Sequence, residues 1–142
     1  MEIRELTTYT QEQLIELNGL LAQLSEGLIL RESDLKSLVE SNGSHLYAAF
    51  SDEGRIVGCA TLCLMETLEG RMGSVEDVVV DSSFRGEHIG RRLIEHIISE
   101  AGKSAPVRIH LTSSPKRIAA NGLYRASGFK LKDTNFYFMS IE

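Results

Sequence analysis

The sequence lacks several features that would assign it to a specialised class of protein. Only two of its 142 residues are cysteines, Cys59 and Cys63, and they are separated by three residues within an apolar segment. That spacing fits neither a Cys-x-x-Cys redox motif nor a disulfide framework, so we expect reduced, buried cysteines. No apolar stretch approaches the roughly 20 residues of a membrane helix. The first residues lack the basic-then-apolar pattern of a secretory leader, and we expect a cytoplasmic protein with no membrane partner.

The sequence also contains no evident set of metal ligands. His45, His96 and His110 have no Asp, Glu or Cys partner at a spacing typical of a metal site, so we predict no metal ion. Repeats, low-complexity tracts and linkers are missing as well. The composition, 42% hydrophobic and 25% charged, is ordinary for a soluble protein. The length suits one compact domain, and we expect residues 1–142 to form it.

Charge is unevenly distributed along the chain. Residues 1–83 hold 5 Lys/Arg and 15 Asp/Glu, a net charge of −10, whereas residues 84–132 hold 10 and 3, a net charge of +7. One interpretation is two solvated faces. The other is that the basic segment attracts a phosphorylated ligand while the acidic segment favours a cationic amine. A duplex-binding protein would need a broad basic face without so acidic a remainder, so we expect no nucleic-acid partner.

Apolar periodicity and turn signals predict a mixed α/β sheet with helices on both faces. The spacing of Thr10 and Gln13 is that of a capping box, and a helix through residue 24 should follow it. Further helices are expected after Ser33 or Asp34, from the glycines of residues 86–90, and from Pro115. The expected strands are residues 2–6, 46–50, 56–65, a strand from the turn at 69–70 through 80, and residues 107–111, 129–131 and 136–141.

The most informative segment is residues 75–90, where an acid-bearing apolar strand precedes a basic, glycine-containing turn that opens a helix. Residues 75–80 have the β-branched density of a buried strand, and isoleucine and leucine recur at helical spacing after the turn. The backbone N–H groups of a first helical turn have no partner within the helix. The turn can therefore present several donors, with the positive end of the helix dipole, to a phosphate.

These residues carry a family resemblance. The sequence of residues 85–90, Arg-Gly-Glu-His-Ile-Gly, resembles the Arg/Gln-x-x-Gly-x-Gly/Ala signature of the GNAT superfamily of N-acetyltransferases, with His88 where the family usually has its first glycine. The Glu-Asp at 76–77 is shared with glucosamine-phosphate N-acetyltransferases. Residues 111–115, 121–124 and 127–129 resemble the family's later strand, helix and strand. The resemblance spans roughly residues 43–138.

The resemblance implies a GNAT-like acyl-CoA N-acyltransferase fold, with a mostly antiparallel sheet of six to seven strands and about four helices. It implies acetyl-CoA as cosubstrate, wedged where two neighbouring strands splay. The turn would grip the pyrophosphate, and main-chain groups of the splayed strand would pair with the pantetheine arm. The cofactor-binding residues would be Val78, Val80, Arg85, Gly86, Glu87, His88, Ile89, Gly90, Arg91 and Asn121. An asparagine often found seven residues before the family's tyrosine is replaced by Arg117, so that contact cannot be transferred.

Three needs of acetyl transfer can be matched to residues: an amine must lose a proton, a thioester carbonyl must be polarised, and a thiolate gains from a proton donor. Glu76 is the candidate base, directly or through a water, because burial in an apolar strand would raise its pKa. Glu76 or Asp77 could equally bind the acceptor, and one of the two could instead close a salt bridge. Tyr124 resembles the family tyrosine that donates to the leaving sulfur; alternatively it is a core tyrosine.

The sequence thus predicts an N-acetyltransferase that moves the acetyl group of acetyl-CoA directly to a primary amine of a small molecule or of a protein lysine. No suitably placed nucleophile indicates a covalent intermediate. The alternatives are a non-catalytic acyl-CoA sensor of the same fold and an unrelated phosphate-binding module. Homodimers are common in the resembling family, so a homodimer is a further expectation. Fold-level similarity does not choose the acceptor.

Overall fold

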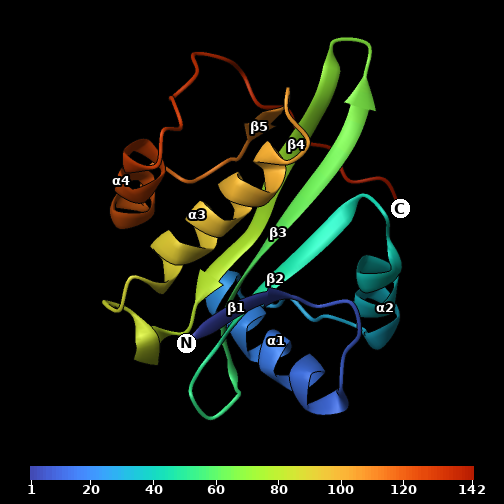
Figure 1. Cartoon of the computed structure of the whole chain (residues 1–142), viewed down its shortest axis with the longest axis vertical. Helices are drawn as coiled ribbons and strands as arrows, with labels where there is room; N and C mark the ends of the chain where they lie inside the picture. The colour runs from blue at the N-terminus through green and yellow to red at the C-terminus, as the bar shows by residue number, and fades with distance from the viewer. The chain divides into compact units, whose positions relative to one another are not determined.

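The computed structural model describes all 142 residues, which form two compact units, Met1–Thr112 and Ser113–Glu142. The expectation of one domain over residues 1–142 stays a prediction. The second unit contains one helix, α4 (Ile118–Ala126). None of the helices is long and apolar enough to cross a membrane. The first unit contains, in chain order, β1 (Glu2–Glu5), α1 (Gln11–Leu24), α2 (Glu32–Glu40), β2 (Ser44–Phe50), β3 (Ile56–Thr67), β4 (Gly70–Val80), the short 3-10 helix η1 (Ser82–Phe84), α3 (Ile89–Gly102) and β5 (Arg108–His110) (Figure 1).

The first unit is built on a sheet whose strands lie in the order β1-β2-β3-β4-β5. The first three pairings are antiparallel, and β4 pairs with β5 in parallel. β2, β3 and β4 form a meander of long neighbouring strands (Figure 1). The mixed, mostly antiparallel sheet with helices confirms the predicted fold class, and β5 enters only after the α3 crossover.

Helices cover both faces of this sheet. On one face, Leu46, Ala48 and Phe50 of β2 pack in a core with buried leucines of α1 and α2. On the opposite face, the ring of Tyr47 lies edge-on to His96 of α3 at 4.9 Å. Alternate residues of a strand point to opposite faces, so α1 and α2 share one face and α3 covers the other.

Two local predictions are confirmed in atomic detail. The Thr10 side chain accepts from the Gln13 N–H at 3.1 Å and the Gln13 side chain accepts from the Thr10 N–H at 3.0 Å, so α1 begins at a capping box. Gly70 has a φ of 106°, which the β3–β4 hairpin requires and which glycine adopts without strain. The start of α1 and the hairpin that leads into β4 are therefore positioned by local signals in the sequence.

Other predicted boundaries are wrong. The sheet has five strands, and residues 129–131 and 136–141 form none, because a strand requires a partner for its backbone groups and these residues have no ladder. The N-cap position of the second helix is Arg31, not Ser33 or Asp34, and its side chain makes no capping hydrogen bond; Arg31 Nε pairs with Asp34 at 2.9 Å. Pro115 lies before α4, which begins at Ile118.

Candidate functional site

The connection from β4 to α3 is held in place at its start by polar contacts. The Ser83 N–H donates to Asp81 Oδ1 at 2.9 Å, and Arg55 Nη2 donates to Asp81 Oδ2 at 3.1 Å. The Ser82 N–H donates to Gln23 Oε1 of α1 at 2.9 Å. The Ser83 N–H, together with Arg55, lowers the pKa of Asp81 below its ordinary value. The turn is thus fixed from two other parts of the fold.

The turn that follows contains two residues in the left-handed region, Gly86 at φ 85° and His88 at φ 61°. His88 is the N-cap of α3, and its side chain makes no capping hydrogen bond. It therefore adopts a backbone conformation that usually favours glycine. Histidine tolerates this region better than most residues with a Cβ.

The backbone N–H groups of residues 85–91 form a continuous run without an acceptor. The helix ladder begins with the Arg92 N–H, which donates to the His88 carbonyl at 3.1 Å. Neither a backbone carbonyl nor a side-chain oxygen accepts from the seven N–H groups before it. Such a run at the positive end of a helix dipole is a site for an anion.

The charges around this run are only partly neutralised. Arg91 Nε pairs with Glu95 of the same helix at 2.8 Å. Arg85 makes no ion pair, and Arg92 Nη1 contacts only the Met1 sulfur, at 3.9 Å. Exposed Glu87 lies in the same turn and opposes an anion there. Arg85 therefore keeps an unpaired charge within the turn of unsatisfied N–H groups.

One edge of β4 is open next to this turn. Pairing with β5 ends at Ser74, opposite His110, whereas pairing with β3 continues to Val80. The Asp81 N–H donates to the Val57 carbonyl at 2.8 Å, toward β3. Because the backbone groups of successive residues alternate in direction, those of Val80 point away from β3, to the open side. Val80 thus has a free main-chain donor and acceptor there, whereas Val78 lies at the irregularity of the strand, and its main-chain role stays a prediction.

Glu76 and Asp77 lie on this same part of β4, at an irregularity of the strand. Asp77 has a φ of 56°, and the register with β3 shifts by one residue there. Both side chains are exposed and neither makes an ion pair, so the structure does not support the salt-bridge alternative. The predicted burial of Glu76 is wrong, because the open edge and the irregularity leave its side chain in solvent.

Asn121 and Tyr124 come together on α4 in the second unit. Asn121 Nδ2 donates to the Ser114 carbonyl at 3.0 Å, which ties the helix to the segment before it. Tyr124 is the buried residue of the helix, and its ring meets Phe129 edge-on at 6.1 Å. Burial raises the pKa of Tyr124 above its ordinary value, and nearby Arg117 partly offsets this effect. The hydroxyl therefore stays protonated at neutral pH and can donate a hydrogen bond.

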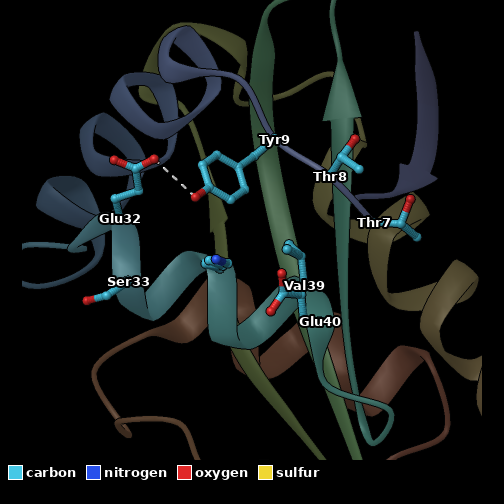
Figure 2. A pocket seen from close by; sticks show the side chains of 8 residues that line it. Thr7, Thr8, Tyr9, Glu32, Ser33, Val39 and Glu40 are labelled. Atoms are coloured by element: carbon cyan, nitrogen blue, oxygen red, sulfur yellow. Dashed lines mark hydrogen bonds between the residues drawn. The ribbon is translucent and has the colours of Figure 1, made fainter.

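A cavity lies away from this edge of the sheet. It has a volume of about 530 Å³ and opens between the β1–α1 connection and α2 (Figure 2). The Tyr9 hydroxyl donates to Glu32 at 3.2 Å inside it. The pKa of Tyr9 is raised chiefly by desolvation and further by the negative charges of Glu32 and Glu40. β1 is three strands away from β4 in the sheet, so this cavity is separate from the open edge. Glu32 already accepts a hydrogen bond from Tyr9, and the cationic Lys36 lines the same cavity, so we propose no reaction there.

Several residues that shape the site carry no local signal in the sequence. Gln23 and Arg55 hold the turn, and Thr61 of β3 bonds to Asp77, but each is far along the chain from its partner. Only a register between β3 and β4 could have paired Thr61 with Asp77. That register depends on a one-residue shift that the apolar pattern does not reveal.

Comparison with known proteins agrees with this geometry. Residues 12–129 match the acetyltransferase (GNAT) family. An IAA acetyltransferase of Azospirillum brasilense is 33% identical over 68% of this chain and 60% of its own length. Glucosamine 6-phosphate N-acetyltransferase 1 of Oryza sativa subsp. japonica is 28% identical over 81% of this chain and 73% of its own. The solved structure of a Trypanosoma brucei acetyltransferase superimposes with a TM-score of 0.76 at 28% identity, covering 98% of this chain and 99% of that one.

Proposed function

Because the chain belongs to the acetyltransferase (GNAT) family, we propose that it transfers the acetyl group of acetyl-CoA directly to a primary amine. The observation that carries this proposal is the run of unsatisfied N–H groups at residues 85–91, next to the open edge of β4. A diphosphate fits the first feature and an amide-rich arm fits the second. The Glu76–Asp77 pair on the same stretch of β4 supplies carboxylates for a cationic amine.

The cosubstrate would be held by main-chain groups more than by side chains. Residues 85–91 would donate to the diphosphate, with Arg85 adding charge, and Val78 and Val80 would pair with the pantetheine amides. Asn121 keeps the cofactor role that the resemblance implies. When bound, acetyl-CoA supplies the activated acetyl group, and the chain supplies position and proton transfer.

We assign the proton transfers to two residues. Glu76, exposed on β4, would take the proton from the ammonium directly or through a water. Tyr124, kept protonated by its raised pKa, would donate to the departing thiolate. Burial raises the pKa of the Cys59 thiol to about 12, so this side chain is no nucleophile, and direct transfer is favoured.

The acceptor is proposed as a primary amine of a small molecule or of a protein lysine. The curated relative from rice is named for an amino-sugar phosphate, and the acidic residues 1–83 favour cationic amines, including a protein lysine. The chain spans 60% of the length of the Azospirillum brasilense relative, so the acceptor and partners of that protein are not assigned to this chain. A cytoplasmic location and a homodimer complete the proposal.

A second candidate is a sensor that binds acyl-CoA without turnover. The observation that favours it is the exposure of Glu76, which lacks the apolar surroundings expected of a tuned base. The presence of Glu76 and Tyr124 together favours the enzyme.

Isothermal titration with acetyl-CoA and with dephospho-CoA separates these candidates. Binding that weakens without the 3′-phosphate is expected, since cations surround the turn. A thiol-release screen in the same buffer would then use glucosamine 6-phosphate, spermidine, an arylalkylamine and a lysine peptide. Turnover on any of these supports the enzyme and identifies its acceptor class. Binding without turnover on all of them favours the sensor, and no binding refutes both.

A further inference from the structure

We propose that Thr61 of β3 is a positioning residue that holds Asp77 in a left-handed β-bulge and thereby directs the Asp77 carboxylate to the ammonium group of the acceptor. The inference rests on the proposed function and adds to it the residue that sets acceptor geometry. It is carried by the register of β3 and β4, by two hydrogen bonds from β3 to Asp77, and by the burial of Thr61.

The register locates the bulge at Asp77 and Val78. Thr61 lies opposite Glu76, and Cys59 lies opposite Val79, so two residues of β4 face the single residue Ala60. In a regular strand, positions 76 and 79 would point to opposite faces. Here the extra residue brings both to the face covered by α1 and α2, where Cys59 and Val79 join the core.

Asp77 is fixed by β3 at both its side chain and its backbone. Thr61 Oγ1 donates to Asp77 Oδ2 at 3.1 Å, and Cys59 Sγ donates to the Asp77 carbonyl at 3.4 Å. Thr61 and Cys59 are two positions apart on the same face of β3, so both can hydrogen-bond to the same residue of β4. Asp77 has a φ of 56°, a conformation that side chains with a Cβ rarely adopt and that its surroundings must enforce.

The hydroxyl of Thr61 has no other role in the structure. The residue is 1% exposed, and it is the one buried polar residue in the core of the sheet. A valine would fill the same space without the desolvation of a hydroxyl group. Since the hydroxyl donates only to Asp77, the function of this group is to hold that carboxylate.

The bond from Thr61 occupies only one of the two carboxylate oxygens of Asp77. Oδ2 accepts from Thr61, whereas Oδ1 has no protein partner, and Glu76 makes no ion pair. The bulge thus places two carboxylates on consecutive residues with acceptor oxygens to spare. A primary ammonium has three N–H donors and one positive charge, which these oxygens match. The chemical class selected by this arrangement is a primary amine in its cationic form.

Spermidine, which has a primary ammonium at each end, is a suitable probe, and its binding can be followed in ¹H–¹⁵N spectra at the amides of residues 76–78. The wild type should show saturable shifts there in 150 mM salt, about the ionic strength that screens weak surface pairing. Thr61→Val should weaken the binding about tenfold, the effect of one charge-assisted hydrogen bond. Thr61→Ser, which keeps the hydroxyl, should stay within about twofold, and Asp77→Asn should lose the site-specific shifts.

Asp52→Asn is the matched control, because it removes one exposed carboxylate far along the chain and should change nothing at residues 76–78. Equal spermidine affinity in wild type and Thr61→Val overturns the inference, as do missing shifts at residues 76–78 in the wild type. If Thr61→Val does not fold, a measurement on the wild-type protein still tests the inference. The Thr61 hydroxyl proton should be protected from exchange and should shift on spermidine addition, and an unprotected proton overturns the inference.

Acetyl-CoA titration separates this inference from the proposed function. Thr61→Val should bind acetyl-CoA as the wild type does, because the Thr61 hydroxyl donates to the Asp77 side chain and makes no hydrogen bond to residues 85–91, Val78 or Val80. A wild type that fails to bind acetyl-CoA refutes the proposed function alone. In the transfer assay Thr61→Val should raise the KM for the amine and leave the KM for acetyl-CoA unchanged, a split that a general loss of structure would not produce.

Discussion

The left-handed conformation of Asp77 predicts an unusual order of stability among its variants. Replacing the side chain leaves the buried Thr61 hydroxyl without an acceptor, which costs about 1–3 kcal/mol. Asp77→Ala also keeps a Cβ at φ 56°, where a left-handed residue costs about 1–2 kcal/mol. Asp77→Gly avoids that strain but loses roughly 0.5–1 kcal/mol of backbone entropy. Glycine should therefore be more stable than alanine here by about 1 kcal/mol, against the usual order in a strand.

Urea unfolding followed by far-ultraviolet circular dichroism measures both free energies of unfolding. Glu66 of β3 offers a matched control, because it is exposed in the same sheet without a positive φ. Glu66→Gly should be less stable than Glu66→Ala, the reverse of the order at position 77. If alanine is as stable as glycine at position 77, the bulge is not strained, and the reasoning that Thr61 enforces it is refuted.

Three further predictions concern the cofactor turn, the proton donor and the buried thiol. Gly90→Leu should abolish acetyl-CoA binding in calorimetry while Gly102→Leu, at the open end of the same helix, leaves it intact; retained affinity in Gly90→Leu would place the cofactor elsewhere. Tyr124→Phe should lower kcat about 10²-fold or more and leave acetyl-CoA affinity nearly unchanged, and an unaltered kcat removes the donor role. In a Cys63→Ser background, iodoacetamide at pH 8 should label Cys59 about a thousandfold more slowly in the folded than in the unfolded protein, because burial raises its pKa from 9.0 to about 12. Because the folded-state pKa is raised, the neutral Cys59 thiol contributes its full share to the free energy of unfolding below pH 9, and this share is lost as the pH rises toward 12. Equal labelling rates in the folded and unfolded protein would contradict the raised pKa.

The parts of the fold that the sequence predicted are those governed by local signals. The capping box at Thr10, the hairpin at Gly70 and the helix after the turn of residues 85–88 each depend on residues within a few positions of one another. The predicted strands at residues 129–131 and 136–141 fail because apolar alternation cannot supply a partner strand.

In the candidate site, too, the features that follow from local signals were predicted, and those that depend on tertiary pairing were not. The turn and its unsatisfied N–H groups follow from the position of a helix start, which the sequence revealed. The exposure of Glu76, the conformation of His88 and the bond from Thr61 to Asp77 depend on strand register and on an open sheet edge. These are properties of tertiary pairing, which no short window of sequence contains.

The short ladder between β4 and β5 also bears on the order in which the sheet assembles. β2, β3 and β4 are joined by short turns, so their pairing closes small loops, whereas β5 reaches β4 only across the length of α3. Three residue pairs form that last ladder. Its amide hydrogens should exchange with solvent before those of the β2–β3–β4 meander. The cosubstrate that we propose to bind at the open edge of β4 would therefore meet the sheet beside its shortest ladder.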